Sequence, residues 1–192
     1  MKKSNKTIIS EIKYLFFKSG GDAYFGEKVS QFEHAAQSLM LAISEEESLE
    51  MQVAAFLHDI GHLLDTDQEN TMEVYGRKDH ETAAKVWLIE RGFSEKIQTV
   101  VENHVPAKRY LCYKYPSYYQ GLSEASKKTM DFQGGVMSKN EAEEFESQVY
   151  FEESIKLRNW DDKAKITNIE VPSLEDCLEI VSKYLERTRV EL

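Results

Sequence analysis

The sequence contains little of the two residues that interrupt helices, with three prolines and nine glycines among 192 residues. Proline lacks a backbone donor and glycine weakens helices, so their scarcity favours long helices. Strand-like alternation of apolar and polar residues is almost absent as well. A chain of this length is long enough to bury a substantial core in one domain. We therefore expect an all-α fold with a single domain.

Cysteine is also scarce. Cys112 and Cys177 lie far apart and form no CxxC pair, which excludes a disulfide framework and favours a reducing, cytoplasmic location. The basic start of the chain leads into an apolar stretch, but Glu11 and Lys13 interrupt it and no small-residue cleavage site follows. No apolar run approaches the roughly 20 residues that a membrane span needs. We expect an amphipathic first helix and no membrane partner.

Positive charge is in deficit. Lysine and arginine number 24 against 34 acidic residues, which gives a formal net charge of −10. Nucleic-acid binders usually carry a basic excess gathered in a stripe. The tyrosine-rich segment 113–119 beside Lys108, Arg109 and Lys114 could suggest single-strand stacking, but we interpret it as a helix-bundle surface or a dimer contact. We expect no nucleic-acid partner, whereas a local basic pocket for a small phosphate-bearing molecule fits an acidic surface.

Helical periodicity recurs along the first half of the chain. Apolar residues at helical spacing predict helices over 29–43, 51–58 and 80–91, with Gly92 placed to end the third. Each of these segments also contains histidine, so the predicted helices would carry the chemically most distinctive side chains.

Other helices are predicted from their end signals. Ser94 can cap a helix that runs to about His104, where Pro106 limits extension. Lys108 is therefore expected at a helix end or in a turn. Nearer the C-terminus, the 159–172 segment is expected to be a loop.

Two helices are predicted in the C-terminal third of the chain. Ser138 and Glu141 have the spacing of a capping box, and they precede a long helix that we expect to reach past Arg158. A last helix is predicted over 174–188.

The sequence contains five histidines, all within the first 104 residues: His34, His58, His62, His80 and His104. Imidazole is the commonest protein metal ligand near neutral pH, and carboxylates complete the sets that divalent and trivalent metals prefer. Asp59 directly follows the second histidine, and its two oxygens can bridge two metals while imidazoles bind each separately. Gly61 permits close approach at this point. The pattern predicts a metal site.

A histidine, a later His-Asp doublet and a distant aspartate resemble the pattern of HD-domain metal proteins. That pattern alone usually implies a metal-dependent phosphohydrolase. Two further histidines lie between the doublet and the last aspartate, and this version resembles the dinuclear branch of the superfamily, which includes di-iron oxygenases. Six residues carry the resemblance: His34, His58, Asp59, His80, His104 and Asp161.

Flanking stretches extend the resemblance over nearly the whole chain, which looks like the PhnZ-type phosphonate oxygenases. The resemblance implies an HD-domain helical bundle, with a single HD domain over 1–192 that includes N- and C-terminal helical additions. The matching stretches are 24–27, 31–34, 57–62, 102–110, 122–126, 128–129, 133–135 and 158–161.

In that family an Fe(II)/Fe(III) pair uses O2 to cleave the carbon–phosphorus bond of a 1-hydroxyalkylphosphonate, giving a carboxylic acid and phosphate. The resemblance implies that Asp59 bridges the two iron ions. The remaining ligands would divide into His34, His58 and Asp161 for one iron and His80 and His104 for the other.

The resemblance also implies substrate contacts. Tyr24 and Glu27 match a family pair that responds to substrate, in which the tyrosine can occupy an iron position and the glutamate lies near the substrate's amino end. These two residues, with His62, are the expected catalytic residues. Phosphonate donors are expected at Lys108 and Arg158, joined by His62, Ser126, Thr129 and Gln133.

Three functions stay open at this point. The first is the oxygenase, whose substrate could be 2-amino-1-hydroxyethylphosphonate, giving glycine, hydroxymethylphosphonate, giving formate, or a trimethylammonio analogue, giving glycine betaine. Glu27 favours the amine. The second is a metal-dependent HD phosphohydrolase acting on a nucleotide or a phosphomonoester. The third is a ligand-sensing HD domain without activity. His80 and His104 fit a second metal and so favour the first, and the sensor ranks last because no ligand is missing.

Overall fold

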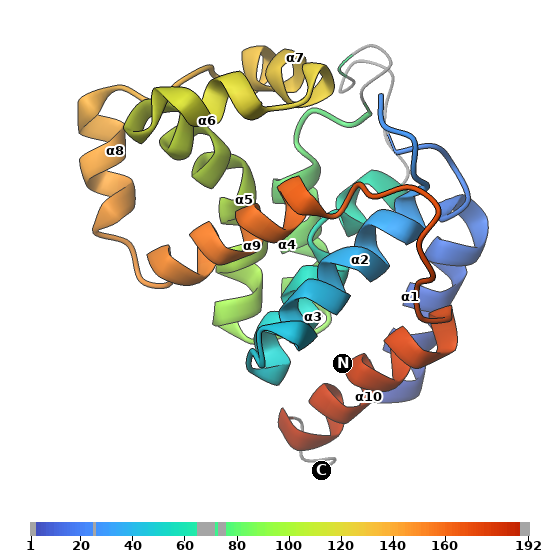
Figure 1. Ribbon diagram of the computed structural model, residues 1–192. Coiled ribbons are helices and arrows are strands. Elements are labelled where there is room, and N and C mark those ends of the chain that lie inside the picture. Colours follow the sequence, from blue (N-terminus) through green and yellow to red (C-terminus); the bar gives the residue numbers. More distant parts are fainter. Residues whose placement is uncertain (1–2, 25, 65–71, 73–75, 189–192) are drawn as a thin grey trace.

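The computed structural model describes residues 3–24, 26–64, 72 and 76–188. Within them the chain forms ten α-helices, one 3-10 helix and no β-strand, so the all-α prediction is confirmed (Figure 1). The elements are α1 (Asn5–Ser19), α2 (Gln31–Ser44), α3 (Leu49–Leu57), η1 (Ile60–Leu63), α4 (His80–Glu90), α5 (Glu95–Lys114), α6 (Pro116–Gly121), α7 (Glu124–Phe132), α8 (Lys139–Glu146), α9 (Phe151–Lys163) and α10 (Leu174–Thr188).

Serine caps start seven of these helices, because each serine hydroxyl accepts a hydrogen bond from a backbone N–H of the first turn. At α2 and α8 a glutamate returns the bond to the capping residue, which completes a capping box. The predicted helices over 29–43, 51–58, 80–91 and 174–188 are confirmed as α2, α3, α4 and α10. The capping serines are Ser4, Ser30, Ser48, Ser94, Ser123, Ser138 and Ser173.

The main core joins the two ends of the chain. Helix α1 packs against α10, and α3 contacts α2, α5, α9 and α10 (Figure 1). Ile8 and Ile12 of α1, Phe56 of α3, Trp160 of α9 and Leu185 of α10 belong to one buried apolar cluster. The long helix α5 contacts both α4 and α9, so α3, α4, α5 and α9 meet around one region of the interior.

Helices α6, α7 and α8 extend from α5 on the side of the molecule away from α1 and α10 (Figure 1). A second apolar cluster, which includes Tyr110 of α5 and Phe145 of α8, packs α8 against α5. A third, formed by Cys112, Leu122 and Met130, packs α7 against α5. No described helix is long and apolar enough to cross a membrane.

The predicted end of the helix near His104 is wrong. Helix α5 continues through Pro106 to Lys114, and Lys108 therefore lies inside a helix. Proline cannot donate to the carbonyl of Glu102, four residues earlier, at a cost of about 3 kcal/mol. Buried residues on both sides of the proline pack against α4 and α9, and this packing outweighs the lost hydrogen bond.

The predicted single helix from Ser138 past Arg158 is also wrong, because α8 and α9 are separate. Tyr150, directly before α9, has φ 67° in the left-handed region, which an α-helix cannot contain. The predicted loop over 159–172 starts later than expected, since α9 runs to Lys163. Asp161 is consequently a helical residue on the same helix as Arg158.

Candidate metal centre

Four histidine side chains form two pairs in the interior. The Nε2 atoms of His34, on α2, and His58, at the end of α3, lie 3.1 Å apart. The Nε2 atoms of His80, on α4, and His104, on α5, lie 3.0 Å apart. All four side chains are buried. The helices that meet in the core thus bring together residues that are 24 positions apart within each pair.

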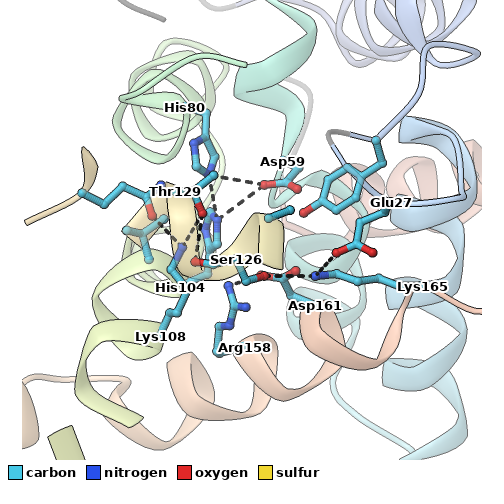
Figure 2. A pocket seen from close by; sticks show the side chains of 14 residues that line it. Glu27, Asp59, His80, His104, Lys108, Ser126, Thr129, Arg158, Asp161 and Lys165 are labelled. Carbon is cyan, nitrogen blue, oxygen red and sulfur yellow. Dashed lines mark hydrogen bonds and ion pairs between the residues drawn. The ribbon is translucent and has the colours of Figure 1, made fainter. Parts of the chain in front are cut away.

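The carboxylate of Asp59 lies between the two pairs. Its Oδ2 atom is 3.5 Å from His34 Nε2 and 3.4 Å from His58 Nε2. Its Oδ1 atom is 3.5 Å from His80 Nε2 and 3.4 Å from His104 Nε2, and Figure 2 shows this second pair. One oxygen faces each pair, which is the arrangement of a carboxylate that bridges two cations.

The backbone orients all four imidazoles in the same way. Each Nδ1 lies within hydrogen-bond distance of a main-chain carbonyl, so Nδ1 carries the hydrogen and Nε2 points its lone pair at the centre. Two lone pairs about 3 Å apart repel each other unless a positive charge lies with them. The accepting carbonyls are those of Ala164, Ala55, Arg77 and Val101, for His34, His58, His80 and His104 in that order.

Asp161 completes the first pair. Its Oδ1 atom lies 3.5 Å from His34 Nε2, while its Oδ2 atom accepts a hydrogen bond of 2.6 Å from Arg158. Asp161 Oδ1 and Asp59 Oδ2 are buried and meet no hydrogen-bond donor among the described residues. Buried, unpaired carboxylate oxygens are costly, and a metal ion would satisfy both. His34, His58 and Asp59 are close enough together to hold one.

The charges of these groups match this arrangement. Burial by itself raises the pKa of Asp59, but the facing His58 and His104 outweigh it and hold that pKa well below its usual range. Burial lowers the pKa of His58, and Asp59 more than compensates, raising it to about 9. In the metal-free protein a second proton, on His58, therefore supplies the positive charge that the facing lone pairs require, and a bound metal ion would replace it.

Tyr24 and His62, two of the predicted catalytic residues, lie against the histidine pairs in the same manner. The Tyr24 ring stacks on His34 and the His62 ring stacks on His80, each with a centroid distance of 3.9 Å and an interplanar angle of 17°. Burial, and then the Asp59 charge, raises the pKa of Tyr24 well above its usual value, so its hydroxyl keeps its proton. Burial lowers the pKa of His62 to about 4, so its imidazole is neutral.

A cavity of about 50 Å³ opens beside Asp59, His80 and His104. It is lined by seven of the eight predicted substrate-binding residues. The eighth, His62, lies behind His80 instead. The seven are Tyr24, Glu27, Lys108, Ser126, Thr129, Gln133 and Arg158.

Lys108 provides a buried cation at one side of this cavity (Figure 2). Its Nζ atom donates to Thr129 Oγ1 at 3.0 Å and to Gln133 Oε1 at 2.6 Å. Burial, and then the charge of Arg158, lowers the pKa of Lys108 to about 7. An ammonium with only neutral hydrogen-bond partners is well placed to bind an anion.

Arg158 is held by acidic partners that the sequence analysis did not identify. Besides Asp161, its guanidinium donates to Asp162, and its Nε donates to the hydroxyl of Tyr118 at 3.1 Å. Tyr118 in turn donates to Asp162. Arg158 and Asp161 lie three residues apart on α9 and form an ion pair there. Tyr118 belongs to the segment interpreted as a helix-bundle surface or a dimer contact; it is half-buried, and its hydroxyl also holds Arg158.

Lys165 is a cavity residue that the sequence analysis missed. Its Nζ atom lies 3.4 Å from Glu27 Oε1 and donates to Ser126 Oγ at 3.3 Å (Figure 2). It follows α9, in the segment expected to be a loop. No periodicity or motif spacing singles out this lysine, so only the three-dimensional arrangement reveals it.

Comparison with known proteins supports a metal centre formed by these residues. The HD domain family model matches residues 31–131, more than half of the chain. The hydroxymethylphosphonate dioxygenase of Gimesia maris is 37% identical over 187 residues, which are 96% of this chain and 92% of that protein. The chain is an HD-domain oxygenase of the PhnZ type. Asp161 and Tyr24 lie outside the family match, although the relative extends over both ends of the chain.

Two further relatives of this HD-domain oxygenase cover most of its length. The [1-hydroxy-2-(trimethylamino)ethyl]phosphonate dioxygenase (glycine-betaine-forming) of Leisingera caerulea is 33% identical, over 94% of this chain and 91% of that protein. Uncharacterized protein L432 of Acanthamoeba polyphaga mimivirus is 40% identical, over 94% of this chain and 83% of that protein. Since two relatives are named dioxygenases, this HD-domain oxygenase is an O2-dependent oxidoreductase.

Proposed function

We propose that the protein holds two iron ions, Fe(II)/Fe(III), and uses O2 to cleave the carbon–phosphorus bond of a 1-hydroxyalkylphosphonate into a carboxylic acid and phosphate. The main support for two metal ions is the position of Asp59, which has one oxygen facing each histidine pair. The proposed ligands are Asp59 for both ions, His34, His58 and Asp161 for one, and His80 and His104 for the other.

The protein's own residues would bind and orient the substrate. When bound, the iron pair supplies the redox chemistry with O2. Lys108, with Thr129 and Gln133 around its ammonium, would bind the phosphonate oxygens. Arg158 would add positive charge while it holds Asp161 in place. The protonated hydroxyl of Tyr24 would serve as a hydrogen-bond donor at the metal centre.

The size of the cavity supports a small substrate. A volume of about 50 Å³ corresponds to on the order of four water molecules by the same measure. A compact hydroxyphosphonate matches this scale far better than a nucleotide does. The phosphohydrolase alternative for nucleotides therefore gains no support from the cavity, and two relatives are named phosphonate dioxygenases.

We propose 2-amino-1-hydroxyethylphosphonate, which would give glycine and phosphate, as the first substrate to test. Glu27 lies across the cavity from Lys108 (Figure 2), so a phosphonate at the lysine would direct its other end towards a carboxylate. Hydroxymethylphosphonate and the trimethylammonio compound are the named substrates of two relatives and belong in the same test. We also propose a cytoplasmic location, which the two free, buried cysteines support.

The test is phosphate release by iron-loaded, partly reduced protein from each of the three compounds, with and without O2. We expect release only with O2 and an equal amount of the matching carboxylic acid, led by glycine. Phosphate release that is equally fast without O2 would show that the protein is a hydrolase and not an oxygenase. Release from none of the three would refute the proposed substrate class.

A further inference from the structure

Glu27 and Lys165 form a wall between two cavities. The inner cavity holds the proposed substrate site. An outer cavity of about 410 Å³ lies beside it, lined by Tyr118, Asp162 and other residues. Glu27 and Lys165 are the two described residues that line both. A substituent on the substrate carbon that points away from Lys108 therefore meets this pair first (Figure 2).

The Lys165 ammonium is held in place by three groups. It lies 3.4 Å from Glu27 Oε1, donates to Ser126 Oγ at 3.3 Å, and is 5.7 Å from the centroid of the Tyr24 ring. The side chains of Lys165 and Glu27 are only 14% and 16% exposed. Solvent screens such a pair weakly, so the two charges compensate each other effectively.

We propose that Lys165 sets the charge preference of the site, which rests on the proposed function of the cavity. With the ion pair intact, Lys165 offsets part of the attraction of Glu27 for a cationic group. A substrate with an amine must displace the ammonium of Lys165 from Glu27 before its own ammonium can bind there. An uncharged substrate such as hydroxymethylphosphonate leaves the pair in place. The outer cavity gives the displaced lysine room to move.

Removing the charge of Lys165 should therefore shift selectivity towards the amine. We expect Lys165→Met to raise the ratio of kcat/KM for 2-amino-1-hydroxyethylphosphonate over hydroxymethylphosphonate by about tenfold, the effect of one charged hydrogen bond. Lys165→Arg keeps the charge and should keep the wild-type ratio. Lys163→Met is the matched control, because Lys163 is exposed and lines neither cavity.

The same comparison is made for binding, by anaerobic calorimetry of both compounds with the iron-loaded variants. The ratio of the two Kd values should shift with Lys165→Met in the same sense. An unchanged ratio, or an equal shift in Lys163→Met, would overturn the proposal. Lys165→Gln replaces Lys165→Met if a thermal melt shows that the methionine variant is unfolded.

The calorimetry distinguishes a failure of this proposal about Lys165 from a failure of the proposed function. If the wild-type protein releases phosphate from neither compound, the proposed reaction fails, while the ratio of Kd values still decides the role of Lys165. Absence of binding by both compounds would refute both proposals. Turnover with a ratio that does not depend on Lys165 would refute only the inference about Lys165.

Discussion

The carboxylate of Asp59 serves both histidine pairs at once, so both proposed metal positions depend on this one residue. Asp59→Ala should therefore lose both metal ions and all O2-dependent activity together. Metal content is measured by atomic emission, beside phosphate release. Asp131→Ala, which removes an exposed aspartate of α7, is the control and should retain both. A protein that keeps its full metal content without Asp59 would refute the bridging role.

The low pKa of Lys108 predicts how anion binding depends on pH. Because burial, and then Arg158, lowers this pKa to about 7, the side chain is a cation below pH 7 and a neutral amine above it. The affinity for methylphosphonate should fall as pH rises through 7. In Lys108→Arg the charge persists, so only the ionisation of the ligand itself should affect affinity.

The Kd of methylphosphonate is measured for the metal-loaded wild-type and Lys108→Arg proteins between about pH 6 and 9, a range around the lowered pKa and below the usual pKa of lysine. The difference between the two curves isolates the lysine. Parallel curves would show that Lys108 keeps its charge throughout and would contradict the prediction.

At the scale of the elements, the contact between η1 and α4 positions His80. A Cβ atom on Gly61 would lie 1.9 Å from the backbone oxygen of His80, so Gly61→Ala must push the two elements apart. We expect a lower Tm and loss of metal from the position of His80 and His104. The position of His34 and His58 should retain part of its metal. Gly21→Ala is the control, since its Cβ would meet no atom within 4 Å.

Metal content and thermal melting are measured for both variants. Full metal content in Gly61→Ala would show that α4 can shift without disturbing His80, and would contradict the close-approach role of this glycine.

The elements also show what could be predicted from sequence. Signals between near neighbours, such as the capping box of Ser138 and Glu141, correctly predicted where α8 begins. Helix α5 was predicted to stop near Pro106, and it continues because of packing against α4 and α9, which are distant contacts without a local pattern. Lys165 was missed for the same reason. The six proposed ligands were found because they resemble a family motif.

For the molecule as a whole, the proposed metal ions would act as cross-links. Their ligands come from α2, the end of α3 and the turn after it, α4, α5 and α9. A metal ion at 100 times its Kd stabilises a fold by about 2.7 kcal/mol, which for this size of chain raises Tm by about 5–11 °C. We expect this rise when iron is added anaerobically to the metal-free protein.

The measurement is a thermal melt with and without Fe(II), followed by addition of a chelator that should reverse the shift. Asp59→Ala should show no shift with iron. An equal rise in that variant would locate the stabilising ion elsewhere in the molecule.

The hydrogen bond between His34 and the carbonyl of Ala164 spans 130 residues and has a consequence for biosynthesis. At a synthesis rate of about 5–20 residues per second, the carbonyl of Ala164 is made roughly 6–26 s after His34. His80 and His104 need only carbonyls three residues away. The two halves of the centre therefore mature at different times, and the half that contains His34 becomes competent for metal only after α9 has been synthesised and docked.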